Sequence, residues 1–267
     1  GLLHVRPIGN VDPRVLVSKR VKVGYAVPEK DGKPAQEPLN GVIGAMAIHQ
    51  QTAEDRKRVL PIDQLYVDIG AKDKDEALEK APAGTPITFD TAFTPFGEGR
   101  ILARALDDRI GCYNMLRLLT CDAHGDTDFV FTCQEEVGCR GAKTAAYSVD
   151  PDIGIALDVT AHGDTPETKL PAIKLGEGAA VKIMDRGSIS NPDLVRELLA
   201  AGERAGVKTQ REVLPFGGTD AMAMQVSRSG VIAGTVSIPC RYVHSACEVV
   251  DLRDVEAARA LLLEYLK

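Results

Sequence analysis

The chain has 267 residues, of which 44% are hydrophobic and 26% are charged, which is ordinary for a globular protein of one large or two moderate domains. Its formal net charge of -6 argues against nucleic-acid binding, because that function needs a basic face. No apolar run approaches the roughly 18 residues that span a membrane, and the first residues, "GLLHVRPIGN", lack the layout of a signal peptide.

Short apolar segments in the first part of the chain predict strands. They are "KRVKVGYAV", "GVIGAMAIHQ", "LYVDIGA" and "GTPITFD". The turn-rich "PEKDGKP" joins the first two as a hairpin connection, and "KDKDEALEKA" has a helix-forming composition with a charged face. Because strands and helices do not alternate regularly here, we expect a β-rich module over residues 1–95.

Strand and helix patterns alternate in the rest of the chain, which predicts a largely parallel sheet with helices on both faces. We therefore expect an α/β module over residues 96–267, in which Asn191 is a helix N-cap and Gly230 ends a helix. The predicted strands are "TDFVFTCQE", "DIGIALDVT", "KTQREVLP" and "VIAGTVSIP". The predicted helices are "DDRIGCYNMLRLLTCD", "GAKTAAYSV", "NPDLVRELLAAGERAG", "TDAMAMQVSRSG" and "DLRDVEAARALLLEYLK".

Acidic residues and one histidine stand at or just after the predicted strand ends of this second module. They are Asp107–Asp108, Glu135–Glu136, Asp158 and His244. Ligands of parallel α/β sheets bind beyond the carboxyl ends of the strands, and burying a carboxylate is costly unless it is paired or binds a metal. Converging carboxylates and an imidazole suit zinc, cobalt or manganese. The residues alone therefore predict a metal-dependent hydrolase.

Each of these positions also has a simpler interpretation. Asp107–Asp108 could supply a helix N-cap, Asp158 could cap a turn, His244 could be a surface histidine, and Glu135–Glu136 could lie in water. Two carboxylates also permit glycoside hydrolysis, which needs them about 5 to 9.5 Å apart across a sugar cleft. Adjacent positions and the absence of Trp disfavour that reading.

The cysteines give no sign of a disulfide framework or a zinc ribbon. Their spacing contains no C-x-x-C pair. We expect free, mostly buried thiols in the reducing cytoplasm. The positions are Cys112, Cys121, Cys133, Cys139, Cys240 and Cys247.

The motifs "ALDDRIG", "QEEVGCRGA", "ALDVTAHGDTPE", "LGEGAAVKIMD", "GGTDAMAMQ" and "IPCRYVHS" resemble the tetrahedral aminopeptidase family. Its members are dinuclear metallopeptidases related to glutamyl and deblocking aminopeptidases, and some carry the name endoglucanase. The match runs from "HVRPIGNVDPRVLVSKRV" to the C-terminus. It implies a zinc-peptidase-like α/β/α sandwich domain with an inserted small β-rich dimerisation domain. Residues 1–95 resemble the insert, and residues 96–267 resemble the C-terminal part of the metallopeptidase domain.

The resemblance also implies a metal-binding set for two divalent ions, zinc or cobalt. Asp107 would bridge the two ions, with a cis peptide bond to Asp108 as is frequent in related enzymes. Asp158 and His244 would complete one metal site with Asp107, and Glu136 would bind the other ion.

Glu135 would be the general base of this aminopeptidase, taking a proton from water and delivering it to the leaving amine. Short peptides would be the substrates, bound by their free α-amino group near the metals. Gly217, Gly218, Thr219 and Asp220 of "GGTDA" would line the substrate pocket. The family also implies self-association into dimers and a dodecamer with an internal chamber.

One motif of the family has no counterpart. Members carry a His-x-Asp metal-binding motif upstream of "VRPIG", whereas His4 is followed by valine and arginine. We expect the chain to be a portion of a longer protein. The alternative is a non-catalytic assembly subunit that has lost one metal site, and two bound ions per chain would favour the enzyme over the subunit.

Overall fold

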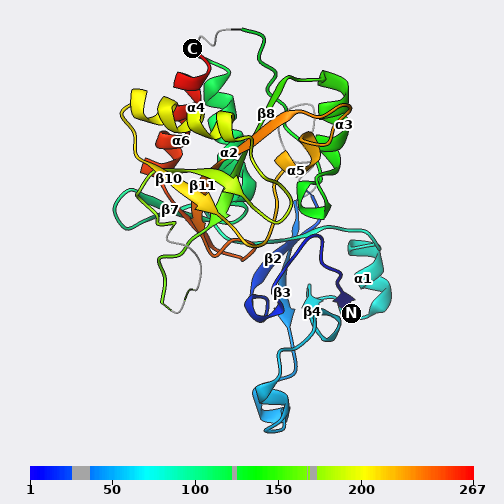
Figure 1. Ribbon diagram of the computed structural model, residues 1–267. Coiled ribbons are helices and arrows are strands. Elements are labelled where there is room, and N and C mark those ends of the chain that lie inside the picture. The colour runs from blue at the N-terminus through cyan, green and yellow to red at the C-terminus, as the bar shows by residue number, and fades with distance from the viewer. Residues whose placement is uncertain (26–36, 122–124, 167, 169–172) are drawn as a thin grey trace. The chain divides into compact units, whose positions relative to one another are not determined.

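The computed structural model describes residues 1–25, 37–121, 125–166, 168 and 173–267 (Figure 1). The chain divides into two compact units. Unit 1 comprises Gly1–Ala92 and His244–Cys247, and unit 2 comprises Phe93–Val243 and Glu248–Lys267. Within these described ranges, no helix has the length and apolar character needed to cross a membrane. The predicted hairpin connection "PEKDGKP" falls outside the described residues.

Unit 1 is built around a five-stranded antiparallel sheet in the order β1-β4-β3-β2-β5. Its core is aliphatic, with Val23 and Val67 each 1% exposed. The helix α1 (Lys74–Lys80) begins at Asp73, whose side chain accepts the Glu76 N–H. The helix and the four strands predicted here are present, and β1 is an additional strand. The predicted strand "GVIGAMAIHQ" is confirmed only in part, because β3 ends at Gly44 and Ile48–Gln50 form the 3-10 helix η2. The strands are β1 (Leu2–His4), β2 (Arg20–Val23), β3 (Leu39–Gly44), β4 (Tyr66–Asp68) and β5 (Ile87–Phe89), and the 3-10 helices are η1 (Pro13–Val15), η2 (Ile48–Gln50), η3 (Asp55–Lys57) and η4 (Ile62–Gln64).

Unit 2 contains a mixed sheet in the order β10-β9-β11-β12-β7-β6, with β8 also paired to β11. Among its described strands, only the β8–β11 and β9–β10 pairs are parallel. The prediction of a largely parallel sheet is therefore wrong. The connections between β6 and β7 and between β11 and β12 are too short for the crossover of a dozen or more residues that a parallel pair needs. The strands are β6 (Thr94–Phe96), β7 (Arg100–Ala103), β8 (Ile153–Ala161), β9 (Ala179–Met184), β10 (Thr209–Val213), β11 (Ile232–Arg241) and β12 (Glu248–Asp251).

Helices pack against alternate residues of the strands of unit 2. Val236 and Ile238 of β11 lie in one core cluster with leucines of α4 and α6, two helices that lie side by side (Figure 1). Ala233 and Ala156 lie in another cluster with Ala221 of α5. Successive strand residues point to opposite faces, so these helices contact different faces of the sheet. The helices are α2 (Leu106–Leu118), η5 (Glu135–Val137), α3 (Arg140–Val149), α4 (Pro192–Arg204), α5 (Ala221–Met224) and α6 (Leu252–Tyr265).

Most predicted elements of unit 2 are confirmed, including α4 with its N-cap. The Asn191 side chain accepts the N–H groups of Asp193 and Leu194. The helix predicted to end at Gly230 is shorter, because α5 stops at Met224 and turns follow. Gly230 has a φ of 108°, a backbone conformation that favours glycine.

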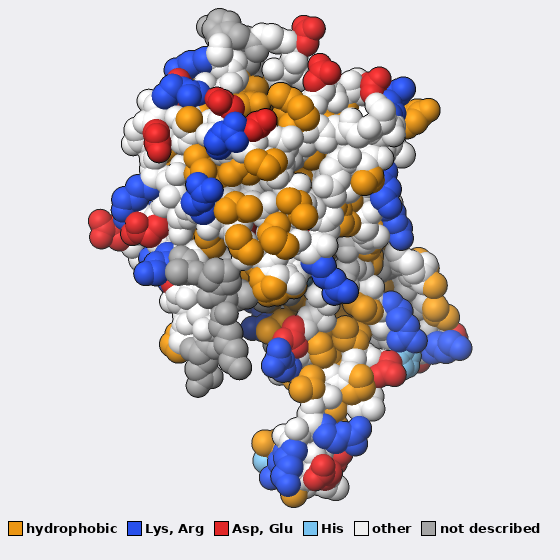
Figure 2. All heavy atoms as spheres, in the orientation of Figure 1, with side chains coloured by type: hydrophobic (Ala, Val, Ile, Leu, Met, Phe, Trp, Pro, Cys, Tyr) orange, Lys and Arg blue, Asp and Glu red, His pale blue; other side chains and the backbone are white. Residues whose placement is uncertain are grey.

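The predicted buried strand "TDFVFTCQE" is wrong. The described residues from 125 to 134 contain no strand, and Val130 and Phe131 are 40% and 43% exposed. A strand needs a hydrogen-bonded partner. None of the described strands pairs with residues 125–134, and β8 pairs only with β11. Apolar side chains also gather on the face of unit 2 visible in Figure 2. The apolar run of this segment is typical of a strand, but none of the described strands pairs with it.

Candidate metal centre

Asp107 and Asp108 are presented where β7 leads into α2. Ala105, just before the helix, has a φ of 51°, and neither aspartate has helical backbone angles. The peptide bond between them is cis, as the resemblance implied. Asp108 Oδ1 accepts the Gly111 N–H at 3.2 Å, so Asp108 caps the regular part of the helix. The N-cap interpretation thus holds for Asp108.

Asp107 is held from the neighbouring strand. Its backbone N–H donates to Glu248 Oε2 at 3.0 Å, and Glu248 of β12 is 2% exposed. Glu248 is not among the site residues predicted from the sequence. Its signal was an acidic residue inside the apolar stretch "ACEVVD", which is unusual because a buried carboxylate needs a partner.

Asp107, Asp108 and Asp158 form a carboxylate cluster in which one oxygen of each lies within 4.8 Å of the others. Asp158 lies inside β8, where it pairs with Ser237 of β11. Burial, and then the charges of Asp108 and Asp107, hold the pKa of Asp158 well above its usual range. Burial and the charge of Asp107 also raise the pKa of Asp108. Such mutual repulsion is relieved when a cation binds.

Glu135 and Glu136 lie on η5, a single 3-10 turn, and not on a strand. The turn is bounded by Gln134 and Gly138, both in the left-handed region. Glu135 is half-buried and Glu136 is exposed, so the two side chains diverge, although for a different reason from the predicted strand alternation. One oxygen of Glu136 lies within 4.8 Å of an oxygen of Asp107. Asp107 therefore has Asp158 and Glu136 within the same short reach, as a bridging ligand requires.

Glu135 lies in a partly dry, acidic environment. Its Oε1 accepts the thiol hydrogen of Cys139 at 3.3 Å. A carboxylate oxygen of Asp220 lies within 4.8 Å of both the Glu135 carboxylate and the Cys139 sulfur. Burial, followed by the charges of Asp220, Glu136 and Asp107, raises the pKa of Glu135 to about 7, against the opposing hydrogen bond from Cys139. A carboxylate with a pKa near the working pH is suited to general acid–base catalysis.

The four predicted pocket residues have different environments. Asp220 Oδ2 accepts a 2.6 Å hydrogen bond from Thr132 Oγ1, which holds this carboxylate beside Glu135. Thr219 is buried, with its hydroxyl 3.0 Å from that of Thr235 in β11. Gly217 has a φ of 68°, which favours glycine, and Gly218 follows it in the loop that leads to α5.

His244 lies in the connection between β11 and β12, within the stretch His244–Cys247 that belongs to unit 1. Its φ is 62°, as is that of Tyr242. Its role as a metal ligand stays a prediction.

The donor set fits a divalent cation bound by oxygen and imidazole. The carboxylates of Asp107, Asp158 and Glu136 offer oxygen atoms of the kind that zinc, cobalt and manganese accept as ligands. Burial and the Glu135 carboxylate raise the pKa of the Cys139 thiol above its usual range. All six cysteines are free thiols, as predicted, although Cys133 is exposed and only Cys139 and Cys240 are fully buried.

Comparison with known proteins decides the family. A family model described as M42 glutamyl aminopeptidase matches residues 1–261. The chain belongs to the M42 glutamyl aminopeptidase family. This M42 member is an aminopeptidase and thus a hydrolase, and the resemblance to the tetrahedral aminopeptidases is confirmed.

Individual peptidases align with the whole chain. A lysyl aminopeptidase of Pyrococcus furiosus is 35% identical over 100% of this chain and 76% of its own length. The solved structure of an aminopeptidase from Desulfurococcus kamchatkensis is 37% identical with a TM-score of 0.89, covering 100% of this chain and 73% of that chain. The TET1 peptidase of Pyrococcus horikoshii, which can assemble into a tetrahedron or a large octahedral shell, is 32% identical with a TM-score of 0.86, covering 100% of this chain and 77% of that chain.

Proposed function

We propose that this M42 aminopeptidase removes amino-terminal residues from short peptides with two divalent ions, zinc or cobalt. Asp107 would bridge the ions, Asp158 and Glu136 would each bind one of them, and His244 would supply the imidazole ligand. The observation that carries the proposal is the placement of Asp107, whose carboxylate lies within 4.8 Å of both Asp158 and Glu136.

Glu135 is the general base of the proposed reaction. Two bound cations would polarise the scissile carbonyl and make water more acidic. Glu135 takes the proton of the attacking water and passes it to the leaving amine. Its half-buried site favours the neutral carboxylic acid, so the proton is readily held between these two steps. The thiol of Cys139 orients the Glu135 carboxylate by donating a hydrogen bond to it. The carboxylate of Asp220 lies within 4.8 Å of both groups.

The loop Gly217–Asp220 is the proposed wall of the substrate pocket. Asp220 lies beside Glu135, so a peptide bound along this loop would have its first peptide bond near the base. The free α-amino group would lie near the acidic cluster, which attracts a cation. This arrangement limits cleavage to the first residue of the peptide.

The finer architecture is also proposed from the family. Residues 96–267 would form the C-terminal part of an α/β/α metallopeptidase sandwich, and residues 1–95 an inserted dimerisation domain. The tetrahedron or large octahedral shell of the Pyrococcus horikoshii peptidase supports self-association. A dodecamer built from dimers and a cytoplasmic location are part of the proposal. A closed assembly needs at least two different contacts between copies.

The substitution Glu135→Gln tests the function. The amide keeps the shape of the side chain but cannot accept a proton, so turnover of a panel of aminoacyl-nitroanilides should fall by more than tenfold. Metal content, measured by atomic emission, should stay unchanged. Glu177→Gln is the matched control, since Glu177 is half-exposed and pairs with Lys208 on the surface. A Glu135→Gln protein that retains a tenth of the activity would remove Glu135 from the base role.

A further inference from the structure

The turn that follows β11 has an uncommon backbone. Tyr242 and His244 both have a φ of 62°, a left-handed conformation that is rare for residues other than glycine. Such a conformation persists only where neighbouring groups hold it. The backbone just before His244 is held by contacts of Arg241 and Tyr242.

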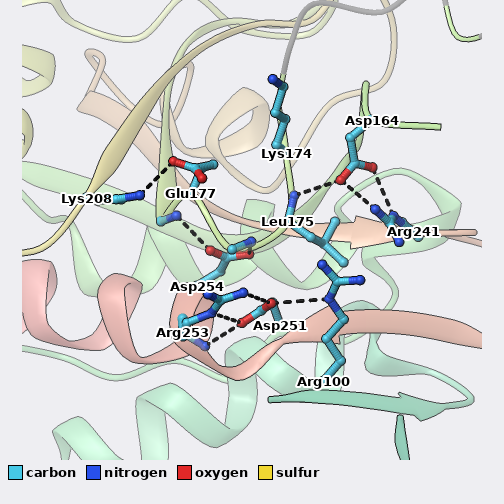
Figure 3. A network of polar contacts seen from close by, with 12 residues as sticks. Arg100, Asp164, Lys174, Leu175, Glu177, Lys208, Arg241, Asp251, Arg253 and Asp254 are labelled. Carbon is cyan, nitrogen blue, oxygen red and sulfur yellow. Dashed lines mark hydrogen bonds and ion pairs between the residues drawn. The ribbon is translucent and has the colours of Figure 1, made fainter. Parts of the chain in front are cut away.

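Arg241, the last residue of β11, is fixed by Asp164. The guanidinium donates from Nε to Asp164 Oδ1 at 2.9 Å and from Nη2 to Asp164 Oδ2 at 2.7 Å (Figure 3). Two parallel charged hydrogen bonds of this kind define an orientation as well as a distance. The side chains are only 18% and 12% exposed, so solvent screens the pair less than a surface ion pair.

Asp164 is itself anchored, and a second contact reaches Tyr242. Asp164 Oδ2 accepts the Leu175 N–H at 3.2 Å, which ties both ends of the β8–β9 connection together. His162 lies with its Nδ1 3.2 Å from Asp164 Oδ1, and its ring packs edge-on against Tyr242 with centroids 6.1 Å apart. His162 therefore contacts Tyr242 and Asp164 binds Arg241, and these are the two residues that begin the turn.

The strands β8 and β11, which the Asp164–Arg241 pair joins, lead to two of the candidate ligands. Ala161 of β8 pairs in parallel with Cys240 of β11. Asp158 lies on β8 before this pair, and His244 follows β11 after it. A displacement of Arg241 would therefore change the direction from which the chain reaches His244, without touching Asp158.

We propose that Asp164 is a positioning residue for metal binding. Through its paired hydrogen bonds to Arg241, it fixes the backbone of residues 241–244 and so the direction in which His244 presents its imidazole. This inference rests on the proposed ligand role of His244. Groups that orient a metal ligand in this way typically change metal affinity by about 10–100-fold when they are removed.

The test measures zinc affinity by competition with a chelator in Asp164→Asn and Arg241→Lys. Asp164→Asn removes the negative charge of the acceptor. Arg241→Lys keeps the positive charge but loses the two parallel N–H donors of the guanidinium. Both should weaken one ion by about 10–100-fold. Lys208→Gln is the control, because it breaks the exposed Lys208–Glu177 pair of the same region (Figure 3), and its affinity should stay that of the wild type.

A metal-free measurement and a double-mutant cycle separate positioning from general damage. Amide hydrogen exchange of residues 242–247 in the metal-free protein should accelerate in Asp164→Asn, while α4 and α6 keep their protection. In a His244→Ala background, Asp164→Asn should have no further effect on affinity. Wild-type affinity in Asp164→Asn, together with loss in His244→Ala, would overturn the positioning role alone. Wild-type affinity in both would overturn the ligand role of His244 as well.

Discussion

The carboxylate of Glu248 accepts the backbone N–H of Asp107 at 3.0 Å. Glu248 lies on β12 opposite Ala103 of β7, so the acceptor comes from the strand beside the one that leads to Asp107. Because Glu248 is 2% exposed, water cannot easily replace this bond. The backbone of the proposed bridging ligand is therefore fixed by a residue that need not touch a metal.

Substitution of Glu248 should weaken metal binding through Asp107. Glu248→Ala leaves the Asp107 N–H without this acceptor, which should lower metal affinity by about 10–100-fold and the free energy of unfolding by about 1–3 kcal/mol. Glu248→Gln keeps an acceptor oxygen and is the matched control. Chelator competition and denaturant unfolding measure the two quantities. An alanine variant that binds metal as tightly as the wild type would show that the bond does not position Asp107.

Gly111 should not tolerate alanine, although it lies in a helix. Gly→Ala inside a helix normally stabilises a protein by about 0.5–1 kcal/mol. Here a Cβ atom at Gly111 would overlap the carboxylate of Asp108. We expect Gly111→Ala to lower both the melting temperature and the metal content, with Leu116→Ala on the exposed side of α2 as the control. A stabilised variant with full metal content would contradict the proposed close packing.

Asp254 should make the stability depend on pH. Burial raises its pKa from 3.8 to about 6 in the folded protein, against hydrogen bonds from the N–H groups of Gly176 and Gly178. The folded state therefore binds this proton more tightly than the unfolded state. The contribution of Asp254 to stability is fully present below about pH 4 and is lost as the pH rises through about 6.

The measurement compares the wild type with Asp254→Asn in denaturant unfolding between pH 4 and pH 7, without added metal. Other carboxylates titrate in both proteins, so the difference between their unfolding free energies isolates Asp254. The wild type should lose stability relative to the variant as the pH rises. A constant difference, or one of the opposite sign, would show that Asp254 is ionised throughout this range.

The sequence predicted the elements whose own residues determine them. The apolar periodicity of α4 and α6 and the long apolar runs of β8 and β11 are sufficient signals. The short strand β12 and the alanine-rich β9 carry too little pattern to be distinguished from other buried segments. "TDFVFTCQE" shows the reverse case, because strand pairing depends on a partner that the pattern of one segment does not contain.

The candidate site was predictable in its residue types but not in its geometry. The acidic pairs stand out in the sequence, and the resemblance to the family implies their roles. Glu135 and Glu136 lie on one 3-10 turn, from which their side chains diverge. This turn is bounded by the left-handed residues Gln134 and Gly138, and hydrophobic periodicity does not predict such a backbone. Glu248 and Asp164 contact residues far away in the sequence. The apolar surroundings of Glu248 could indicate that it is buried, but no local pattern identifies the partner of either residue.

The two-ion site bridged by Asp107 is tested most directly by the number of metal ions bound per chain in the wild type, Asp107→Asn and His244→Ala. This number is measured by atomic emission after equilibration with zinc. We expect two ions in the wild type. Asp107→Asn should weaken both ions, because a bridging ligand serves both, and His244→Ala should weaken chiefly one. A wild type with one ion, or an equal loss of a single ion in both variants, would contradict the two-ion site bridged by Asp107.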